Sequence, residues 1–405
     1  MSSSEARNRT VNLGAGPSML PTGVLEEAAQ GVLDYAGTGI GVTELSHRSK
    51  TFKDLLGKAE ADLRKLLDIP QEYAVIFLQG GGTEQFSATL LNLLAAHAAK
   101  HPSYGNRAPP VDYIVSGSWS AKAYKEAQRL TPRVNVACDV RPSVGNAAVP
   151  VPAPADWNLS PLDELPALLF YCDNETIDGF EFPQDYILGL PAAYRERVPI
   201  VADCSSNVLS RRINVRAHSV LFFGAQKNIG PSGTAVVVVR RDLVVDPDAV
   251  QAAYVPPIPS TLVYRNAVAN GSLYNTPPMF PIYVSGIVFR DLLRDGGVDA
   301  AQRRAHAKAQ LVYDALVRHA DVYRPTVAHP DFRSQMNITF RVCEGATKPP
   351  SEEREALFVK RCAEHNVVQV QGHRSVGGIR ASFYNASTIE QAEAFVRVLD
   401  SFARG

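Results

Sequence analysis

The architecture of the chain is indicated by residues 73–84, which read Tyr73-Ala74-Val75-Ile76-Phe77-Leu78-Gln79-Gly80-Gly81-Gly82-Thr83-Glu84. Its first six residues form an apolar run that predicts a buried strand, and the three glycines then make a tight turn. A helix is predicted over about residues 84–99. Ligands of open α/β sheets bind beyond the carboxyl ends of the strands, so the amides of this turn are placed to meet an anion. A tight turn without a ligand fits the same residues equally well.

The alternation of short strand and longer helix continues along the chain from this stretch. A second unit follows, with a strand at Val111–Val115 and a helix over about residues 120–129. Further apolar runs predict strands at residues 167–171, 199–202, 219–224 and 235–240. Such alternation is typical of a mostly parallel sheet flanked by helices.

The order of the predicted elements changes from about residue 290, where helices and short strands predict an α+β C-terminal part. The last helix is expected to begin at Ser387-Thr388-Ile389-Glu390, which reads as an S-x-x-E capping box. A chain of 405 residues, 45% of them hydrophobic, is long for a single core. The sequence therefore predicts two domains, or one large domain with a smaller appendage.

Composition excludes several classes of partner and site. Lys plus Arg and Asp plus Glu are balanced at 41 each, so no net field favours nucleic acid or an anionic membrane. Five cysteines without a C-x-x-C pair argue against a disulfide framework and a structural zinc site, and no metal is expected. The polar segment Met1–Glu5 lacks the apolar core of a signal peptide. We expect a cytoplasmic protein without nucleic-acid or membrane partners.

Two charged residues lie where apolar strands are predicted to end. Asp203 follows the run at 199–202, and two roles are open for it: holding a pyridine nitrogen protonated, or capping the next turn. Lys227 lies in a glycine-flanked loop after another apolar run. A buried lysine has a lowered pKa and can serve as a nucleophile and general base, whereas a solvated loop lysine is the ordinary alternative.

Nucleotide-binding motifs do not explain the glycine turn. The dinucleotide fingerprint needs glycine where Gln85 stands, and no Gly-Lys-Ser/Thr follows the turn as a P-loop requires. A nucleotide-binding α/β protein without catalysis is therefore disfavoured, and so is a catalytically retired homologue, because Lys227 and Asp203 are both present.

The glycine turn, Trp119, Thr176, Asp203 and Lys227 occur in the order and approximate spacing of fold-type I pyridoxal-phosphate enzymes. Along nearly its whole length the chain resembles the phosphoserine aminotransferase family, a class V member of that group. The motifs that carry the resemblance are residues 12–17 (NLGAGP), 44–49 (ELSHRS), 174–179 (NETIDG), 202–206 (ADCSS), 224–231 (GAQKNIGP), 274–278 (YNTPP) and 372–380 (GHRSVGGIR).

The resemblance implies an α/β, fold-type I transferase with a mainly parallel, seven-stranded sheet. A large cofactor-binding domain would span residues 15–285. A smaller α+β C-terminal domain would span residues 286–405 and include the N-terminal segment 1–14.

The resemblance also implies a pyridoxal 5'-phosphate site. Lys227 would hold the cofactor covalently and shuttle the proton at the substrate Cα, while Asp203 would pair with the ring nitrogen. Trp119 would stack on the ring, although a core aromatic is the alternative, and Thr176 would bond the ring hydroxyl. The remaining residues would bind the phosphate: Gly82, Thr83 and Gln226 from the same subunit, and Asn275 and Thr276 from the partner of a homodimer.

The substrate anions need cations, which the family would supply from His47, Arg48, His373, Arg374 and Arg380. Arg380 would clamp the α-carboxylate through two parallel hydrogen bonds. The two His-Arg pairs would converge on a group that is either phosphate or the side-chain carboxylate of glutamate. For either pair alone, an exposed surface position is the alternative.

Many bacterial relatives carry Arg where this chain has Thr83, so the substrate phosphate loses one cation here. The reaction implied is the reversible transamination of 3-phosphohydroxypyruvate with glutamate in serine biosynthesis. The rivals are an alanine–glyoxylate aminotransferase and a cysteine desulfurase. A desulfurase needs an exposed, mobile cysteine, and Cys343 and Cys362 instead occur in patterns of packed residues.

Overall fold

The computed structural model describes residue 7 and residues 9–405. A seven-stranded sheet forms its centre, in the order β2-β8-β7-β6-β5-β3-β4. The bounds of these strands are Tyr73–Gly80 (β2), Val111–Val115 (β3), Val134–Asp139 (β4), Leu168–Cys172 (β5), Ile200–Asp203 (β6), Val220–Gly224 (β7) and Gly233–Arg240 (β8). Only β8 runs antiparallel to its neighbours β2 and β7. The mainly parallel α/β sheet expected from the sequence is therefore confirmed.

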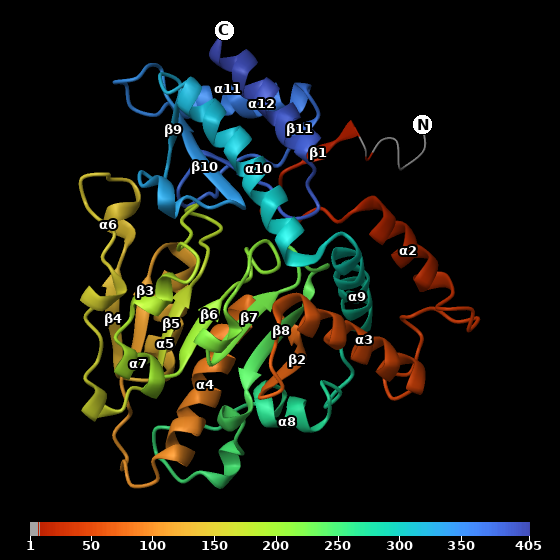
Figure 1. Ribbon diagram of the computed structural model, residues 1–405, viewed down its shortest axis with the longest axis vertical. Helices are drawn as coiled ribbons and strands as arrows, with labels where there is room; N and C mark the ends of the chain where they lie inside the picture. The colour runs from red at the N-terminus through yellow and green to blue at the C-terminus, as the bar shows by residue number, and fades with distance from the viewer. Residues whose placement is uncertain (1–6, 8) are drawn as a thin grey trace.

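The helices cover both faces of the sheet (Figure 1). Their bounds are Thr22–Leu33 (α2), Lys50–Leu67 (α3), Gly82–Lys100 (α4), Ser118–Leu130 (α5), Arg141–Val144 (α6), Ala192–Arg197 (α7), Tyr264–Ala269 (α8) and Met279–Arg294 (α9). Alternate residues of β2 enter different cores, because side chains of a strand point to opposite faces in turn. Val75 packs in the core with α3 and α9, whereas Ile76 packs in the core with α4, α5 and α8.

A third core joins the C-terminal elements, which lie above the sheet in Figure 1. These elements are the helices Gly297–Arg318 (α10), Glu352–Glu364 (α11) and Ile389–Ala403 (α12), and the strands Tyr323–Pro325 (β9), Asn337–Val342 (β10), Val367–Val368 (β11) and Ile379–Ser382 (β12). Strands β9, β10 and β12 form an antiparallel sheet. The N-terminal strand β1 (Val11–Asn12) pairs in parallel with β11. This part of the predicted segment 1–14 thus packs with the C-terminal elements, while residues 1–6 and 8 lie outside the described residues.

Some predicted boundaries were wrong by one or two residues. Helix α4 begins at Gly82 instead of residue 84, and Asp203 is the last residue of β6 instead of the residue after it. The cap of α12 is also displaced by one position, because Thr388 and Gln391 exchange the two hydrogen bonds of the capping box. None of the helices in the described part of the chain combines the length and apolar character needed to cross a bilayer.

Candidate active site

A cavity of about 430 Å³ opens at the carboxyl ends of β5, β6 and β7. This is the edge at which parallel α/β sheets bind ligands. The predicted site residues that line it are Gly82, Trp119, Thr176, Asp203, Gln226, Lys227, His373 and Arg380. Segments 12–17, 174–179, 202–206, 224–231 and 372–380 thus meet at one place, although they lie far apart in the sequence.

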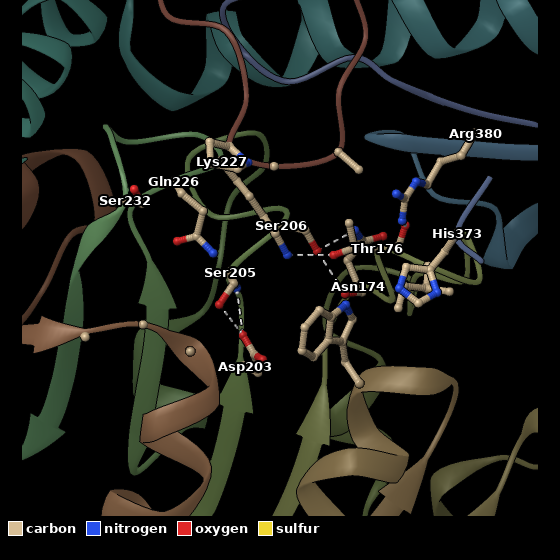
Figure 2. A pocket seen from close by; sticks show the side chains of 18 of the residues that line it. Asn174, Thr176, Asp203, Ser205, Ser206, Gln226, Lys227, Ser232, His373 and Arg380 are labelled. Carbon is tan, nitrogen blue, oxygen red and sulfur yellow. Dashed lines mark hydrogen bonds between the residues drawn. The ribbon is translucent and has the colours of Figure 1, made fainter. Parts of the chain in front are cut away.

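Lys227 follows strand β7 and points into the cavity toward Thr176, as Figure 2 shows. Only 9% of Lys227 is exposed, and its Nζ donates to Thr176 Oγ1 at 2.7 Å. Its backbone carbonyl accepts a hydrogen bond from the Ser18 hydroxyl, which ties the N-terminal segment to the loop. Burial lowers the pKa of the Lys227 ammonium, and the nearby Asp203 carboxylate opposes that shift. The amine is therefore more readily neutral, and nucleophilic, than a solvated lysine.

Asp203 presents one carboxylate oxygen to the cavity. Its Oδ1 accepts from the Ser205 amide at 2.9 Å and from the Ser205 hydroxyl at 2.6 Å. Its Oδ2 has only the weak Cys172 thiol donor, 3.9 Å away. Burial raises the pKa of this carboxyl, while Lys227 and the Ser205 bonds lower it. A carboxylate held by one oxygen, with the other free, suits a protonated ring nitrogen as its partner.

The glycine turn leaves room beside Asp203. Gly80 has φ +116°, a conformation that favours glycine. A Cβ on Gly82 would lie 3.0 Å from Ser205 Oγ and 3.9 Å from Asp203 Oδ2. Helix α4 starts at Gly82, so its amide end faces the cavity, where it can bind a phosphate.

Trp119 lies in the first turn of α5 and is part of the lining of the cavity. The Lys227 Nζ is 5.8 Å from its ring centroid, and the Lys122 Nζ is 4.1 Å away. Among the described residues, three buried polar atoms of the lining lack a hydrogen-bond partner: Trp119 Nε1, Asn174 Oδ1 and Arg380 Nε. Because buried polar groups are nearly always paired, these atoms fit a polar ligand in the cavity. The polar lining, with Lys227, the free oxygen of Asp203 and the amide end of α4, fits pyridoxal phosphate together with an anionic substrate.

His373 and Arg380 lie together on the side of the cavity away from Asp203 and Ser205 (Figure 2). Arg380 comes from β12, and its Nη1 donates to the Thr176 carbonyl at 3.2 Å. Burial lowers the pKa of the Arg380 guanidinium, which stays charged at neutral pH because its ordinary pKa is above 12. The His373 Nδ1 shares a hydrogen with Ser375 Oγ at 2.7 Å.

Several predicted site residues do not reach this cavity in the single chain. The side chain of Thr83 is exposed, because α4 turns it toward an outer groove that Lys122 and Lys125 also line. The predicted binding of the cofactor phosphate by Thr83 stays a prediction, because this side chain does not line the cavity of the single chain. The other residues outside the cavity are His47, Arg48, Arg374, Asn275 and Thr276, all exposed except the half-buried His47. The two His-Arg pairs do not converge within one chain.

Other lining residues were not predicted as part of the site. Asn174, Ser205, Ser206 and Ser232 line the cavity. Ser205 could have been found, because a serine two residues after a strand-end aspartate is placed to bond that carboxylate. The predicted packing role of Cys343 and Cys362 is confirmed, since both thiols are buried.

Comparison with known proteins agrees with this geometry. The sequence profile of the aminotransferase class-V family matches residues 10–395. A phosphoserine aminotransferase of Acinetobacter baumannii is 42% identical over 396 residues, which cover 98% of this chain and 99% of that protein. The structure of phosphoserine aminotransferase from Bacillus circulans subsp. alkalophilus superposes with a TM-score of 0.84 at 37% identity, covering 98% and 99% of the two chains. A pyridoxal-phosphate-bound phosphoserine aminotransferase from Trichomonas vaginalis superposes with a TM-score of 0.81 at 35% identity, covering 96% and 99%.

Proposed function

The chain belongs to the phosphoserine aminotransferases of the class-V aminotransferase family, and from that premise we propose its reaction and the roles of its residues. It is a pyridoxal-phosphate-dependent aminotransferase. It transfers the amino group of glutamate to 3-phosphohydroxypyruvate and forms O-phospho-L-serine and 2-oxoglutarate, reversibly, in serine biosynthesis. The observation that carries this reading is Lys227 Nζ, held by Thr176 in a cavity with Asp203 at one side and Arg380 at the other.

Bound pyridoxal phosphate supplies an electron sink for the carbanion formed at the substrate Cα. Lys227 holds the cofactor and then, as a neutral amine, moves the proton at that carbon. Asp203 keeps the ring nitrogen protonated through its free Oδ2, and Ser205 holds the carboxylate in orientation. Trp119 stacks on the ring and Thr176 bonds its hydroxyl oxygen. The phosphate is bound by Gly82, Thr83 and Gln226. Thr83 contributes from the first turn of α4, because it is not part of the cavity lining.

Arg380 binds the substrate α-carboxylate, and His373 binds the anionic group at the other end of the substrate. The support for this division is that both side chains reach the same side of the cavity. His47, Arg48 and Arg374 join this anion site when two subunits meet and substrate binds. An anion site used for phosphate in one half-reaction and for the glutamate side chain in the other explains how one enzyme accepts both.

The enzyme works as a homodimer in which Asn275 and Thr276 bind the cofactor phosphate of the partner subunit. Both residues are exposed on the single chain, next to Tyr274, which is 44% exposed. Further exposed apolar side chains, Leu33 and Ile40, precede His47 and Arg48 in the chain. An exposed apolar surface beside predicted site residues is what a subunit interface requires.

The large domain comprises residues 15–285, and the small domain residues 286–405 with the segment 1–14. The separate core of the C-terminal elements and the β1–β11 pair support this division, except that helix α9, which spans the proposed boundary, packs with α3 in the core of the large sheet. We place the enzyme in the cytoplasm, since its five buried free thiols suit a reducing compartment.

Acceptor specificity tests the proposed reaction. Steady-state rates would be measured with glutamate as donor and with 3-phosphohydroxypyruvate, hydroxypyruvate, pyruvate or glyoxylate as acceptor. The proposal predicts the highest kcat/KM for the phosphorylated acid by far. Comparable rates with glyoxylate would support an alanine–glyoxylate type of activity instead and would overturn the substrate assignment.

A further inference from the structure

The helix that carries Trp119 has no side-chain cap of its own. Helix α5 begins at Ser118, and the residue before it is Gly117. The first amides of a helix have no partners inside the helix and are usually satisfied by a serine, threonine or aspartate side chain at this position. Gly117 cannot provide one, so the amides of the first turn must be bound from elsewhere.

Two carboxylates of the loop after β5 bind these amides. Glu175 accepts from the Trp119 amide at 2.8 Å and from the Ser120 amide at 2.9 Å. Asp178 accepts from the Ser118 amide at 2.7 Å and from the Ser118 hydroxyl at 3.2 Å. The first three amides of α5 are thus held by residues more than 50 positions away in the sequence.

Gly117 gives an independent indication that the fold is built around this contact. A Cβ at this position would lie 2.5 Å from Asp178 Oδ2 and 2.7 Å from the Glu175 carboxyl carbon. Real Cβ atoms do not approach so closely, so an ordinary capping residue would displace both carboxylates. The glycine allows the two acids to replace a local cap.

The arrangement is costly for a contact that only caps a helix. Glu175 is fully buried, and burial, followed by the neighbouring Asp178 carboxylate, raises its pKa to about 7. One exposed serine would cap a helix without burying a pair of acids. The positive end of the helix dipole and the hydrogen bonds from the amides stabilise the carboxylates. The burial of two acids where one serine would suffice indicates that they do more than cap the helix.

The same loop also holds two other groups of the cavity. Between Glu175 and Asp178 lies Thr176, whose hydroxyl accepts from Lys227 Nζ at 2.7 Å. The Thr176 carbonyl accepts from Arg380 Nη1 at 3.2 Å. One short loop therefore contacts the amine, the carboxylate-binding cation and the helix that carries the indole.

We propose that Glu175, with Asp178, is a positioning residue that sets the indole of Trp119 at its place relative to Thr176 and Lys227. The loop connects the two groups. The side chain of Thr176 faces the cavity, and Glu175 and Asp178 fix the distance between Thr176 and the first turn of α5. This inference rests on the proposed function, because the ring beside Trp119 is that of pyridoxal phosphate. Neither acid lines the cavity, so both act through Trp119.

Tryptophan fluorescence tests this proposal. The chain has two tryptophans, so Trp157→Phe leaves Trp119 as the sole emitter. Bound cofactor stacked on Trp119 should quench its emission in this parent holoenzyme. In Glu175→Gln the NH2 group replaces one of the two oxygens that accept the Trp119 and Ser120 amides, so at least one of these two hydrogen bonds is lost. We expect a several-fold gain in Trp119 emission at equal cofactor content.

The matched control is Glu181→Gln, which also replaces a fully buried acid by its amide. Glu181 accepts from the Gln335 amide at 2.8 Å and lies near Arg211, and it makes no hydrogen bond with α5. It should lose thermal stability but keep the quenching of the parent. Glu175→Asp, which keeps the charge and shortens the side chain, replaces Glu175→Gln if that variant does not fold.

The two ways of failing are separable. If the Glu175 variant binds cofactor and quenches Trp119 like the parent, the positioning role is overturned. If the parent binds no cofactor, the proposed function is overturned instead. The access of acrylamide to Trp119 in cofactor-free protein then still decides the positioning role: it should rise in the Glu175 variant and not in Glu181→Gln.

Discussion

Two lysines among the described residues are buried, and the difference between them indicates which one can do chemistry. Lys308 donates to the carbonyls of Tyr384 and Ser387 at 2.7 and 2.8 Å, so its ammonium is largely occupied by the protein. Lys227 donates to Thr176 alone. The remaining N–H donors of Lys227 face a cavity, whereas Lys308 uses two of its donors to hold the turn between Tyr384 and Ser387.

Replacing Asp203 by Asn tests the role of the free Oδ2. Asparagine preserves the shape of the side chain but cannot keep a ring nitrogen protonated. We expect kcat to fall by roughly 10²-fold or more, the scale at which a positioned proton-transfer group contributes, with little loss of folding stability. Ser205→Ala, which removes one of the two bonds to Oδ1 and the acceptor of the Gly224 amide, should lower kcat less. Pre-steady-state rates with glutamate measure both effects, and an Asp203→Asn variant with the parent rate would contradict the assignment.

The pH dependence of cofactor capture tests the environment of Lys227. Burial lowers its pKa below the ordinary 10.5 in the folded, cofactor-free protein. The reactive neutral amine is therefore populated at a lower pH than for a solvated lysine, and the rate of covalent capture should rise with pH and level off below 10.5. To measure this rate, the reaction is stopped at intervals with borohydride, and the fraction of protein that carries covalently bound cofactor is determined. A rate that keeps rising through pH 10.5 would show that the lysine is solvated.

At the scale of elements, the strands were predictable where both faces are buried. The run Tyr73 to Leu78 is continuously apolar because α3 and α4 cover opposite faces of β2. Strand β4 was missed because its first residues, Val134-Asn135-Val136, are only half-buried and include a polar side chain. The edge strand β2 was found because helices bury both of its faces, whereas a half-buried strand lacks the continuous apolar signal that such burial imposes.

The cavity was predictable only where a residue lies at a strand end or in a recognisable motif. Asp203 and Lys227 follow apolar runs, so sequence reasoning found them. Asn174 was not singled out, because its place depends on a partner in the small sheet: its Nδ2 donates to Asn337 Oδ1 at 2.9 Å. A contact between residues 163 positions apart leaves no local pattern in the sequence. Arg374 was expected to join His373 at the anion site, but it is exposed and does not line the cavity of the single chain.

Helix α10 is joined to the cavity wall through Lys308, and this link is testable. The turn that Lys308 holds also contacts the large sheet's loops: the Tyr384 hydroxyl donates to the Ala15 carbonyl at 2.7 Å, and the Asn385 amide donates to Asn228 Oδ1 at 2.9 Å. Lys308→Met removes the donor to the buried Ser387 carbonyl and one of the two donors to the Tyr384 carbonyl, which also accepts from the Ser387 amide; this should cost about 1–3 kcal/mol.

Calorimetry measures this prediction, with Lys360→Met as the control. Lys360 is exposed on α11, so its replacement should leave the Tm nearly unchanged. The Lys308 variant should melt clearly lower and bind pyridoxal phosphate more weakly, because Ala15 lines the cavity. An unchanged Tm for Lys308→Met would contradict the proposed link between α10 and the cavity.

At the scale of the whole molecule, one chain brings only some of the predicted site residues together. The cavity contains Lys227, Asp203 and Arg380, while Asn275, Thr276, His47 and Arg48 lie on its outside. A shared-site homodimer accounts for both groups, because each subunit would complete the cavity of the other.

Complementation between two inactive variants tests the shared site. Lys227→Ala would be mixed, after dissociation and reassociation, with a variant that carries Asn275→Ala and Thr276→Ala. Half of the dimers should then be mixed, each with one intact site, so activity should return to about a quarter of the parent value. A chain carrying all three substitutions, treated in the same way, serves as the control. Activity no greater than that of the separate variants would contradict a site built from two subunits.

The central claim is that Lys227 holds pyridoxal phosphate and that the enzyme carries an amino group from glutamate to a phosphorylated keto acid. The absorption spectrum of the purified protein tests it most directly, with glutamate added first and 3-phosphohydroxypyruvate afterwards. The account predicts a yellow protein that bleaches with glutamate, regains its colour with the phosphorylated acid but not with pyruvate, and loses all these changes in Lys227→Ala. A protein that stays colourless after reconstitution with pyridoxal phosphate, or a yellow one that ignores both substrates, would contradict the account.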